Sequence, residues 1–364
     1  MYVYPLNSSI SRSFFVALYH DADRLYSYYF THALLSCISQ IKVKKSGVFF
    51  PNLDGIRAFA CLSVFVAHTF DYINNRVLSN SIEIWIYEHL IIGAGAMGVS
   101  LFFVLSGFLI TYLLLREKKI AGRINLKFFY IKRVLRIWPM FLAVTLVGFI
   151  LIPMVTHSLD LEGIQSHLPW YLTFTNNFDR ILTGFTGFGN DAMGALWSVA
   201  VEEQYYLIWP LILIITNKKT LPYVATAIIV ASAIFRYLYH DSGSIVFYHS
   251  ISVAGDLAIG GLAAYFGYYS ANFRSFFTNL KLWSRIAIYI VILLILGNHN
   301  TLLSTGEVGV FGRIPLTFSF AFLIADQCFS EDNIIAIKRI PWLSKLGTIS
   351  YGFYCIHMFV IMLF

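Results

Sequence analysis

Charged residues are scarce in this sequence, and so are the residues that build metal or disulfide sites. Only 12% of the 364 residues are Asp, Glu, Lys or Arg, whereas soluble domains carry about 25%. Together with 58% hydrophobic residues and a mean hydropathy of +0.70, this shortage excludes a soluble globular protein. The four cysteines form no CxxC pair and lie in or beside apolar stretches. The sequence therefore predicts neither a disulfide framework nor a bound metal ion.

A basic face or tail of the kind that binds nucleic acid is also missing. The net charge is +7, but the Lys and Arg residues lie in short groups between apolar segments. Membrane topology explains this distribution better, because the cytoplasmic loops of membrane proteins are enriched in Lys and Arg. We therefore expect membrane lipids, and no nucleic acid, among the partners of this chain.

Long apolar runs make up most of the sequence and predict an all-α fold, a polytopic transmembrane helical bundle of about nine to ten spans. The candidate spans are 56–73, 91–115, 137–156, 195–216, 221–240, 251–270, 285–299, 308–328 and 346–364. Every second connection is rich in Lys and Arg, while the connections between these (74–90, 157–194, 241–250 and 300–307) contain only Arg76 and Arg180. The positive-inside rule then places Arg57 and the 116–136 connection in the cytoplasm.

We interpret residues 47–364 as one transmembrane domain, because no internal repeat and no linker to a soluble domain is visible. Residues 1–46 are an N-terminal extension. Their apolar and aromatic part, 26–41, is interrupted by His32 and lacks the layout of a signal peptide. It forms either an interfacial helix or an extra span, which would be the tenth.

A histidine deep inside an apolar helix is the first indication of chemistry. Arg57 and His68 are eleven residues apart, which in a helix is about 16 Å along the axis and within about 20° of the same direction. With Arg57 at one membrane surface, His68 lies near the middle of the ~30 Å hydrocarbon layer, where an ionisable side chain is a candidate for function. Helix packing is the alternative role.

Two further spans carry ionisable residues to a similar depth. Glu202 lies about 10 Å below the outer end of its span, and His357 lies about 18 Å beyond Lys345. Because an isolated charge in lipid costs about 2.5 to 3.5 kcal/mol, we expect His68, Glu202 and His357 to meet around a polar cavity. Glu203 points about 100° away from Glu202, so only one of the two carboxylates can face His68. An interhelical hydrogen bond is the alternative for this pair.

Other polar residues within spans are weaker candidates for the same cavity. They are Asp256, Arg236, Arg313 and Ser106. The first three equally suit pairing between helices or contact with the membrane surface. Ser106 stands with Gly98 and Gly107 in an otherwise apolar span, where small residues permit a close approach of helices or a kink.

The segment FFYIKRVLRIWP carries Lys132, Arg133 and Arg136 directly before a span. Arg133 and Arg136 are three residues apart and are therefore neighbours on one helix face. Guanidinium groups bind phosphate through paired hydrogen bonds, so the segment predicts contact with a nucleotide-bearing cytoplasmic ligand. Membrane topology and contact with anionic lipid are the alternative explanation.

Five segments together carry a family resemblance. They are LDGIRAFACLSVFVAH (53–68), GVSLFFVLSGFLITYLLL (98–115), FFYIKRVLRIWP (128–139), LWSVAVEEQYYLIWPL (196–211) and ISYGFYCIH (349–357). In this order they resemble acyltransferase family 3, bacterial integral membrane proteins that O-acylate cell-surface glycans. The resemblance implies that Arg57 and His68 form the family's Arg-x10-His motif, with His68 essential for transfer. It also implies that Arg133 and Arg136 contact an acyl-CoA donor. Glu202 matches the acidic position of the family's fourth helix, and His357 matches the histidine after its Tyr-x-x-Tyr pattern.

From this resemblance we expect a membrane O-acyltransferase of the bacterial cytoplasmic membrane. It would move an acyl group, above all acetyl, from cytoplasmic acyl-CoA to a hydroxyl of an extracytoplasmic or lipid-linked saccharide. His68 would act as a general base or carry the acyl group itself, with Glu202 or Glu203 orienting its ring. No soluble esterase-like domain follows the spans, so a stand-alone transferase is expected. The alternative is a proton-coupled exporter of a glycan or small solute, which would not consume acyl-CoA.

Overall fold

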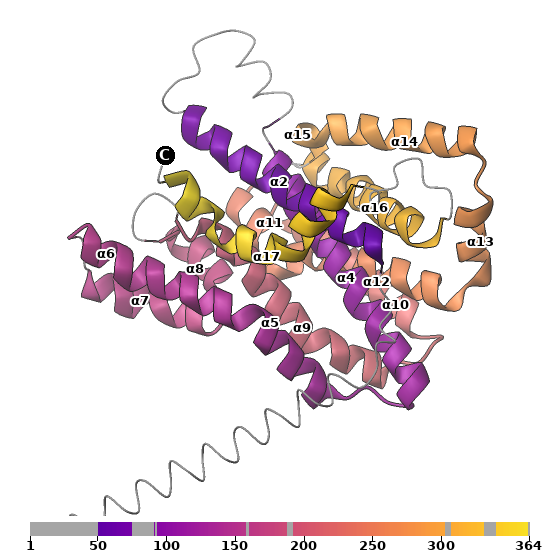
Figure 1. Ribbon diagram of the computed structural model, residues 1–364, viewed down its shortest axis with the longest axis horizontal. Coiled ribbons are helices and arrows are strands. Elements are labelled where there is room, and N and C mark those ends of the chain that lie inside the picture. Colours follow the sequence, from indigo (N-terminus) through magenta and orange to yellow (C-terminus); the bar gives the residue numbers. More distant parts are fainter. Residues whose placement is uncertain are drawn as a thin grey trace, which may run out of the picture. The chain divides into compact units, whose positions relative to one another are not determined.

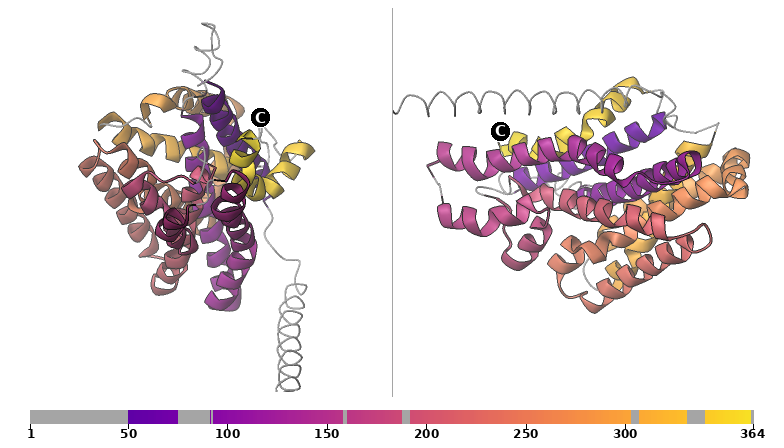
Figure 2. Two further views of the ribbon diagram at one scale, coloured as in Figure 1. Left: turned by 90° about the vertical axis from the view of Figure 1, so that its left-hand side faces the viewer. Right: turned by 90° about the horizontal axis from the view of Figure 1, so that it is seen from below.

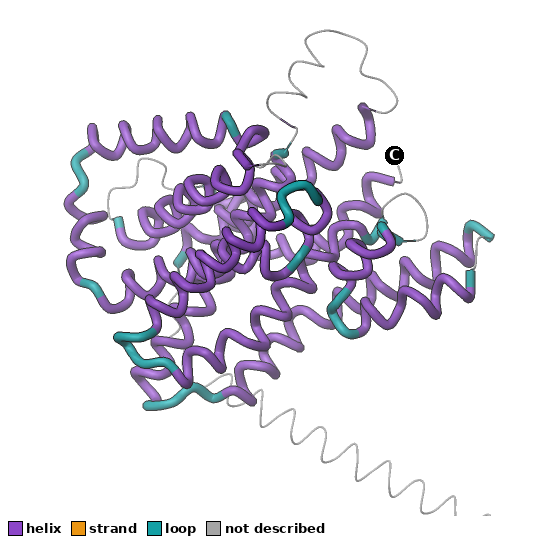
Figure 3. The backbone as a smooth tube through the Cα atoms, turned by 180° about the vertical axis from the view of Figure 1, so that it is seen from behind, coloured by secondary structure: helices purple, strands orange, loops and turns teal. Residues whose placement is uncertain are grey.

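The computed structural model describes residues 50–74, 91, 93–157, 160–187, 192–302, 307–330 and 340–362. The predicted extension, 1–46, and the last two residues of the predicted final span lie outside the described residues. Within the described ranges the chain consists of helices joined by short connections, and no strand is present (Figure 3). The prediction of an all-α fold is confirmed.

The helices follow one another in a single series. They are α2 (Pro51–Asn74), α4 (Ala94–Ala121), α5 (Leu126–Leu146), the π-helical turn η2 (Val147–Leu151), α6 (Ile152–Val155), α7 (Leu161–Leu172), α8 (Asn176–Thr183), the 3-10 turn η3 (Gly194–Leu196), α9 (Trp197–Ile215), α10 (Leu221–Leu238), α11 (Gly243–Tyr248), α12 (Ser250–Tyr269), α13 (Ala271–Asn279), α14 (Leu282–Gly297), α15 (His299–Leu302), α16 (Glu307–Phe329) and α17 (Pro341–Met362). Each predicted span falls on one of these helices or on the continuous run from α5 to α6.

The helices form a multi-pass membrane bundle. Among the described residues, seven helices are long and apolar enough to cross a membrane, or eight if α13 and α14, bent by 98°, form one span. The sequence predicts nine spans, and a tenth in 26–41 that lies outside the described residues. For the nine, the difference lies in this bent pair and in α17, where Lys345, His357 and several hydroxyl groups lower the apolar content. Large apolar side chains such as Leu207 and Ile208 are exposed on the bundle, as expected for a surface that lipid covers.

Local sequence signals set several helix ends. α4 ends at Gly122, whose φ of 72° is a left-handed conformation that glycine adopts without strain. α5 begins after Asn125, whose side chain accepts a hydrogen bond from the Phe128 N–H. α7 begins in the same way after Asp160, which accepts from the Gly163 N–H. These caps fix the short connections that return the chain into the bundle.

Glycines bring α4 into backbone contact with its neighbours. A Cβ atom on Gly107 would lie 1.9 Å from the carbonyl oxygen of Leu257 in α12. A Cβ atom on Gly98 would lie 2.6 Å from the carbonyl oxygen of Ala60 in α2. The prediction that Gly98 and Gly107 permit a close approach of helices is confirmed, and the small residues make α4 a central helix of the bundle.

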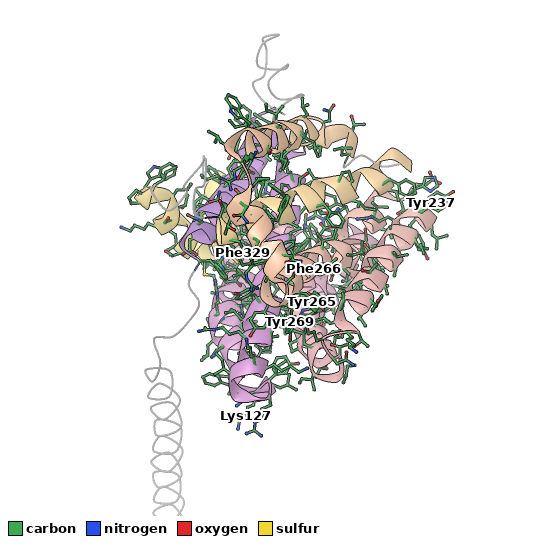
Figure 4. The ribbon with its side chains drawn as sticks, turned by 90° about the vertical axis from the view of Figure 1, so that its right-hand side faces the viewer. Lys127, Tyr237, Tyr265, Phe266, Tyr269 and Phe329 are labelled. Atoms are coloured by element: carbon green, nitrogen blue, oxygen red, sulfur yellow. The ribbon has the colours of Figure 1, made fainter. Side chains whose placement is uncertain are left out.

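One end of the bundle gathers lysines and tyrosines, and we call it the basic end. Lys118, near the end of α4, donates hydrogen bonds to carbonyl groups at the end of α9 at 2.6 and 3.0 Å. Tyr265 donates to the Lys218 carbonyl, and the Lys218 ammonium lies 5.0 Å from the ring centre of Tyr269. Figure 4 shows Lys127 pointing away from the bundle at this end. Such a mixture of aromatic and basic side chains is typical of a membrane interface.

The first and last described helices lie side by side. α2, in indigo, and α17, in yellow, are adjacent in Figure 1 and in both views of Figure 2. Both begin near the basic end, because Phe50 packs on Tyr112 of α4 and Gly347 packs on Asp54. Residues far apart in the sequence therefore meet between these two helices.

Candidate active site

Near their first turns, α2 and α17 approach so closely that their backbones are in contact. A Cβ atom on Gly347 would lie 1.7 Å from the Asp54 carbonyl oxygen, so no larger residue fits there. Further along, the rings of Phe65 and Phe353 lie 5.2 Å apart. The two helices run in the same direction, and their next pair of facing side chains is His68 and His357.

The two histidines form a hydrogen-bonded pair. The Nδ1 atom of His68 lies 2.8 Å from the Nε2 atom of His357, and the ring planes differ by 11°. His357 is buried, with an exposed fraction of 1%. Its Nδ1 atom lies 2.6 Å from the carbonyl oxygen of Tyr354. The predicted meeting of these two histidines at a similar depth is therefore present in the structure.

The hydrogen bonds define which nitrogen of His68 is basic. A carbonyl oxygen only accepts, so Nδ1 of His357 carries a hydrogen and donates it to Tyr354. In a neutral His357 the Nε2 atom is then the acceptor, and Nδ1 of His68 is the donor. The lone pair of a neutral His68 is therefore on its Nε2 atom. A neighbouring group that selects the tautomer in this way is common where histidine acts as a base.

His68 lines a cavity of about 600 Å³, which we call the His68 chamber. Other residues of its wall are Asp71, Arg180, Trp197, Tyr248 and Tyr354. These come from α2, α8, α9, α11 and α17. The chamber lies at the end of the bundle where α9 begins, which is opposite the basic end.

A second cavity, of about 130 Å³, lies nearer the basic end, and we call it the arginine chamber. Its wall includes Arg57, Ser106, Arg133, Arg136, Glu202 and Tyr206. Arg57 pairs with Asp54 one turn earlier in α2. The Arg133 guanidinium lies between two rings, 5.6 Å from that of Phe129 and 5.4 Å from that of Tyr206. The chamber therefore presents three guanidinium groups and one carboxylate.

The two chambers share part of their walls. Val99 of α4 and Tyr354 of α17 line both. The Tyr354 hydroxyl lies 2.7 Å from Ser198 Oγ and donates to the Ala195 carbonyl at 3.2 Å, which holds the ring between α17 and α9. The two chambers are therefore neighbours, and Tyr354 and Val99 are exposed to a ligand in either of them.

Glu202 lies in the arginine chamber, whereas the sequence predicted that it meets His68. It accepts hydrogen bonds from Ser106 Oγ at 2.8 Å and from the Tyr206 hydroxyl at 2.7 Å. Glu203 points toward α5, where the Trp138 indole N–H donates to it at 2.9 Å. His357 contacts the His68 ring from a facing helix, and the hydrogen bonds of the two carboxylates go to other side chains.

The basic segment is divided between chamber and surface. Arg133 and Arg136 line the arginine chamber as the phosphate hypothesis requires. Arg133 is half-buried, and both Lys132 and Arg136 are exposed. Lys132 lines neither chamber, and its ammonium lies 3.9 Å from the ring centre of Phe128. One step of about 100° along the helix turns Lys132 away from the face that Arg133 and Arg136 share.

Asp256, Arg236 and Arg313 line neither chamber. Arg313 of α16 binds Asp256 of α12 at 2.7 Å and also donates to Ser100 Oγ of α4 at 3.0 Å. Arg236 donates to the Ser252 carbonyl at 3.4 Å. All three are buried, so they join helices inside the bundle. Their alternative role, pairing between helices, is the one the contacts favour.

The sequence did not identify two residues of the chamber walls, Tyr354 and Arg180, as candidates for function. Tyr354 appeared only as part of the Tyr-x-x-Tyr pattern, although it lines both chambers. The sequence does single out Arg180, because the connections predicted to lie outside the cytoplasm contain only two basic residues and Arg180 is one of them. Its position on the chamber wall depends on α7 and α8, whose packing the sequence pattern does not define. Among the described residues no group of three or more His, Cys, Asp or Glu side chains is arranged to hold a metal ion.

Comparison with known proteins identifies relatives of the chain. The family model described as an acyltransferase domain matches residues 50–364. The peptidoglycan O-acetyltransferase OatA of Listeria monocytogenes is 27% identical over 339 residues, covering 86% of this chain and 49% of the relative. YrhL of Bacillus subtilis, provisionally named a peptidoglycan O-acetyltransferase, is 29% identical over 344 residues, with the same two coverages. The chain thus spans about half the length of these relatives. No solved structure matches it.

Proposed function

Because the chain belongs to acyltransferase family 3, a family of membrane enzymes that transfer acyl groups, we propose that it moves an acetyl group from acetyl-CoA to a hydroxyl of a saccharide. The relatives named as peptidoglycan O-acetyltransferases support a cell-wall glycan as the acceptor. The basic end would face the cytoplasm of a bacterial cell, and the His68 chamber would open to the outer side of the cytoplasmic membrane.

The donor binds in the arginine chamber. Its phosphate groups contact Arg133 and Arg136, because guanidinium groups bind phosphate through charge-assisted hydrogen bonds. The apolar part of the wall, with Phe102, Leu109 and Leu113, suits the pantetheine arm. The arm then directs the thioester toward Tyr354, beyond which lies His68. Glu202, held by Ser106 and Tyr206, keeps these hydroxyl groups in place on the wall.

The reaction takes place at His68. Its Nε2 atom accepts the proton of the acceptor hydroxyl while the oxygen attacks the thioester carbonyl. The CoA sulfur leaves and takes the proton back from Nε2. During this step the His68 ring is an imidazolium whose Nδ1–H points at Nε2 of His357, and this neutral ring stabilises the charge. General base catalysis of this kind contributes roughly 10²- to 10⁴-fold in rate.

A second course of the same reaction uses His68 as an acyl carrier. Nε2 attacks the thioester, CoA leaves, and the acyl-imidazole is then transferred to the saccharide hydroxyl. The two courses need the same tautomer of His68 and the same pairing with His357. They differ in whether CoA is released before the acceptor binds, and a burst of CoA release in the absence of acceptor distinguishes the carrier course.

The observation that carries this proposal is that two chambers of different chemistry share the wall at Tyr354, with the basic nitrogen of a histidine in one of them. The test is the release of free CoA from acetyl-CoA by detergent-purified protein with soluble peptidoglycan fragments as acceptor. We expect release by wild type and at least a roughly 10²-fold loss in His68→Ala. The control is His240→Ala, which should release CoA like wild type, because this half-exposed histidine lines neither chamber. Equal release by wild type and His68→Ala would reject the mechanism.

A further inference from the structure

We propose that the saccharide acceptor carries an anionic group, which Arg180 binds on the wall of the His68 chamber. This inference rests on the proposed function, because it takes the His68 chamber as the acceptor site. It adds the charge of the acceptor and the residue that selects it.

Arg180 is held in a defined position on this wall. Its Nη1 atom donates a hydrogen bond of 2.8 Å to the Gly194 carbonyl, just before α9 begins. Its guanidinium carbon lies 4.5 Å from the ring centre of Tyr248, which also lines the chamber. A cation that is stacked on an aromatic ring and fixed by a carbonyl loses little freedom when it binds a ligand. The position is therefore built before any ligand arrives.

Among the carboxylates that the structure describes, none forms an ion pair with Arg180. The ion pairs of the described residues involve other arginines and histidines. Asp179, the adjacent residue on α8, accepts instead from His167 at 2.9 Å. A guanidinium group has five N–H donors, and the Gly194 carbonyl accepts from one nitrogen only. The remaining donors suit a carboxylate or a phosphate.

The rest of the chamber suits a sugar. The rings of Trp197, Phe247 and Tyr248 form a continuous aromatic wall, with centres 4.9 to 5.3 Å apart. Such a wall can cover the apolar C–H face of a sugar ring, while a few polar groups fix its orientation. His68 and Asp71 stand on α2 and Arg180 on α8, so a bound saccharide can place its anion at α8 and its hydroxyl at His68. The volume of about 600 Å³ leaves room for more than one ring.

The anion has two chemical sources that the same guanidinium would accept. One is a carboxylate on the sugar itself, and the other is a phosphate that links the sugar to a lipid. Three soluble probes separate them: the N-acetylglucosamine–N-acetylmuramic acid disaccharide with its lactyl carboxylate, the same disaccharide with the carboxylate reduced to an alcohol, and N-acetylglucosamine 1-phosphate. Dissociation constants for the full chain in detergent are measured by titration calorimetry.

We expect wild type to bind at least one of the two anionic probes at least tenfold more tightly than the alcohol, as charge-assisted hydrogen bonds imply. Arg180→Gln removes this preference, and Arg180→Lys keeps part of it and shows that the chamber still folds. Arg123→Gln, at an exposed arginine between α4 and α5, leaves the preference unchanged. Preference for the disaccharide carboxylate identifies an acidic sugar, and preference for the phosphate alone identifies a lipid-phosphate-linked sugar.

Two results would overturn the inference: wild type that binds neither anion more tightly than the alcohol, or a preference that survives in Arg180→Gln. The CoA-release measurement separates this failure from that of the proposed function. CoA release that depends on His68, without any preference for anions, rejects only the role of Arg180. A preference for anions without CoA release leaves Arg180 as a binding residue and rejects acyl transfer.

Discussion

Nδ1 of His68 lies 2.8 Å from Nε2 of His357, and Nδ1 of His357 lies 2.6 Å from the Tyr354 carbonyl. Each ring thus uses one nitrogen to set the hydrogen position on the next. The final acceptor is a backbone carbonyl that is part of α17 itself, so the orientation of His68 depends on the fold of a helix and not on a mobile side chain.

Replacing His357 with Ala removes the acceptor that holds the His68 tautomer. We expect kcat for CoA release to fall by about 10²-fold, because the basic nitrogen is no longer oriented. The KM for acetyl-CoA should stay near that of wild type, since His357 does not line the arginine chamber. Initial rates over a range of acetyl-CoA concentrations measure both values. Wild-type kcat in this variant would show that the pair is not needed.

Substitutions in the arginine chamber should change the KM for acetyl-CoA and not kcat. Arg133→Ala and Arg136→Ala should each raise the KM for acetyl-CoA by about tenfold, which corresponds to the loss of one phosphate contact. Lys132→Ala is the matched control, because this neighbouring cation is exposed and does not line the chamber. An increase in KM in Lys132→Ala equal to that in the arginine variants would point to general surface charge as the cause.

Two glycines of α17 offer a test of the α2 contact. Gly347→Ala places a Cβ atom 1.7 Å from the Asp54 carbonyl, and we expect a loss of stability of about 1 to 3 kcal/mol together with loss of activity as α17 shifts against α2. Gly352→Ala adds the same methyl group where nothing lies within 4 Å. Thermal melting in detergent compares the two. A variant Gly347→Ala that melts like Gly352→Ala would contradict the close approach of the helices.

The buried Asp256–Arg313 pair predicts an effect on stability alone. Asp256→Asn leaves the Arg313 charge without its carboxylate, which costs about 3 to 5 kcal/mol at a buried site. Combining it with Arg313→Met removes the remaining charge and should restore much of the stability. The fraction of protein that folds should keep the CoA-release rate of wild type, because neither residue lines a chamber. A change in its KM or kcat would instead assign Asp256 to the reaction.

The sequence allowed a prediction of depth along each helix but not of the direction in which a residue faces. Counting helical steps from Arg57 and from Lys345 brought His68 and His357 to a similar level, and they form a pair. The same counting brought Glu202 to that level, yet its side chain binds Ser106 and Tyr206 in the arginine chamber. Which neighbour a helix turns toward depends on packing, and the pattern within one span does not contain it.

Contacts between segments that are far apart in the sequence were even harder to predict than the direction in which a residue faces. The contact of Gly347 with Asp54 sets the spacing of α2 and α17, and neither segment shows by itself that the other is its partner. Arg180 reaches the His68 chamber only because α8 packs between α7, α9 and α11. Lys132 and Arg133 are neighbours in the sequence, but a rotation of about 100° along the helix separates a residue that lines no chamber from one that does. The family resemblance selected the two arginines that line the chamber but did not place Arg180.

The pairing of His68 with His357 joins residues separated by 289 positions. During synthesis, α2 enters the membrane long before α17 has been translated. A partly made chain therefore holds His68 without the ring that pairs with it, and the hydrogen-bonded pair forms only after α17 has joined α2.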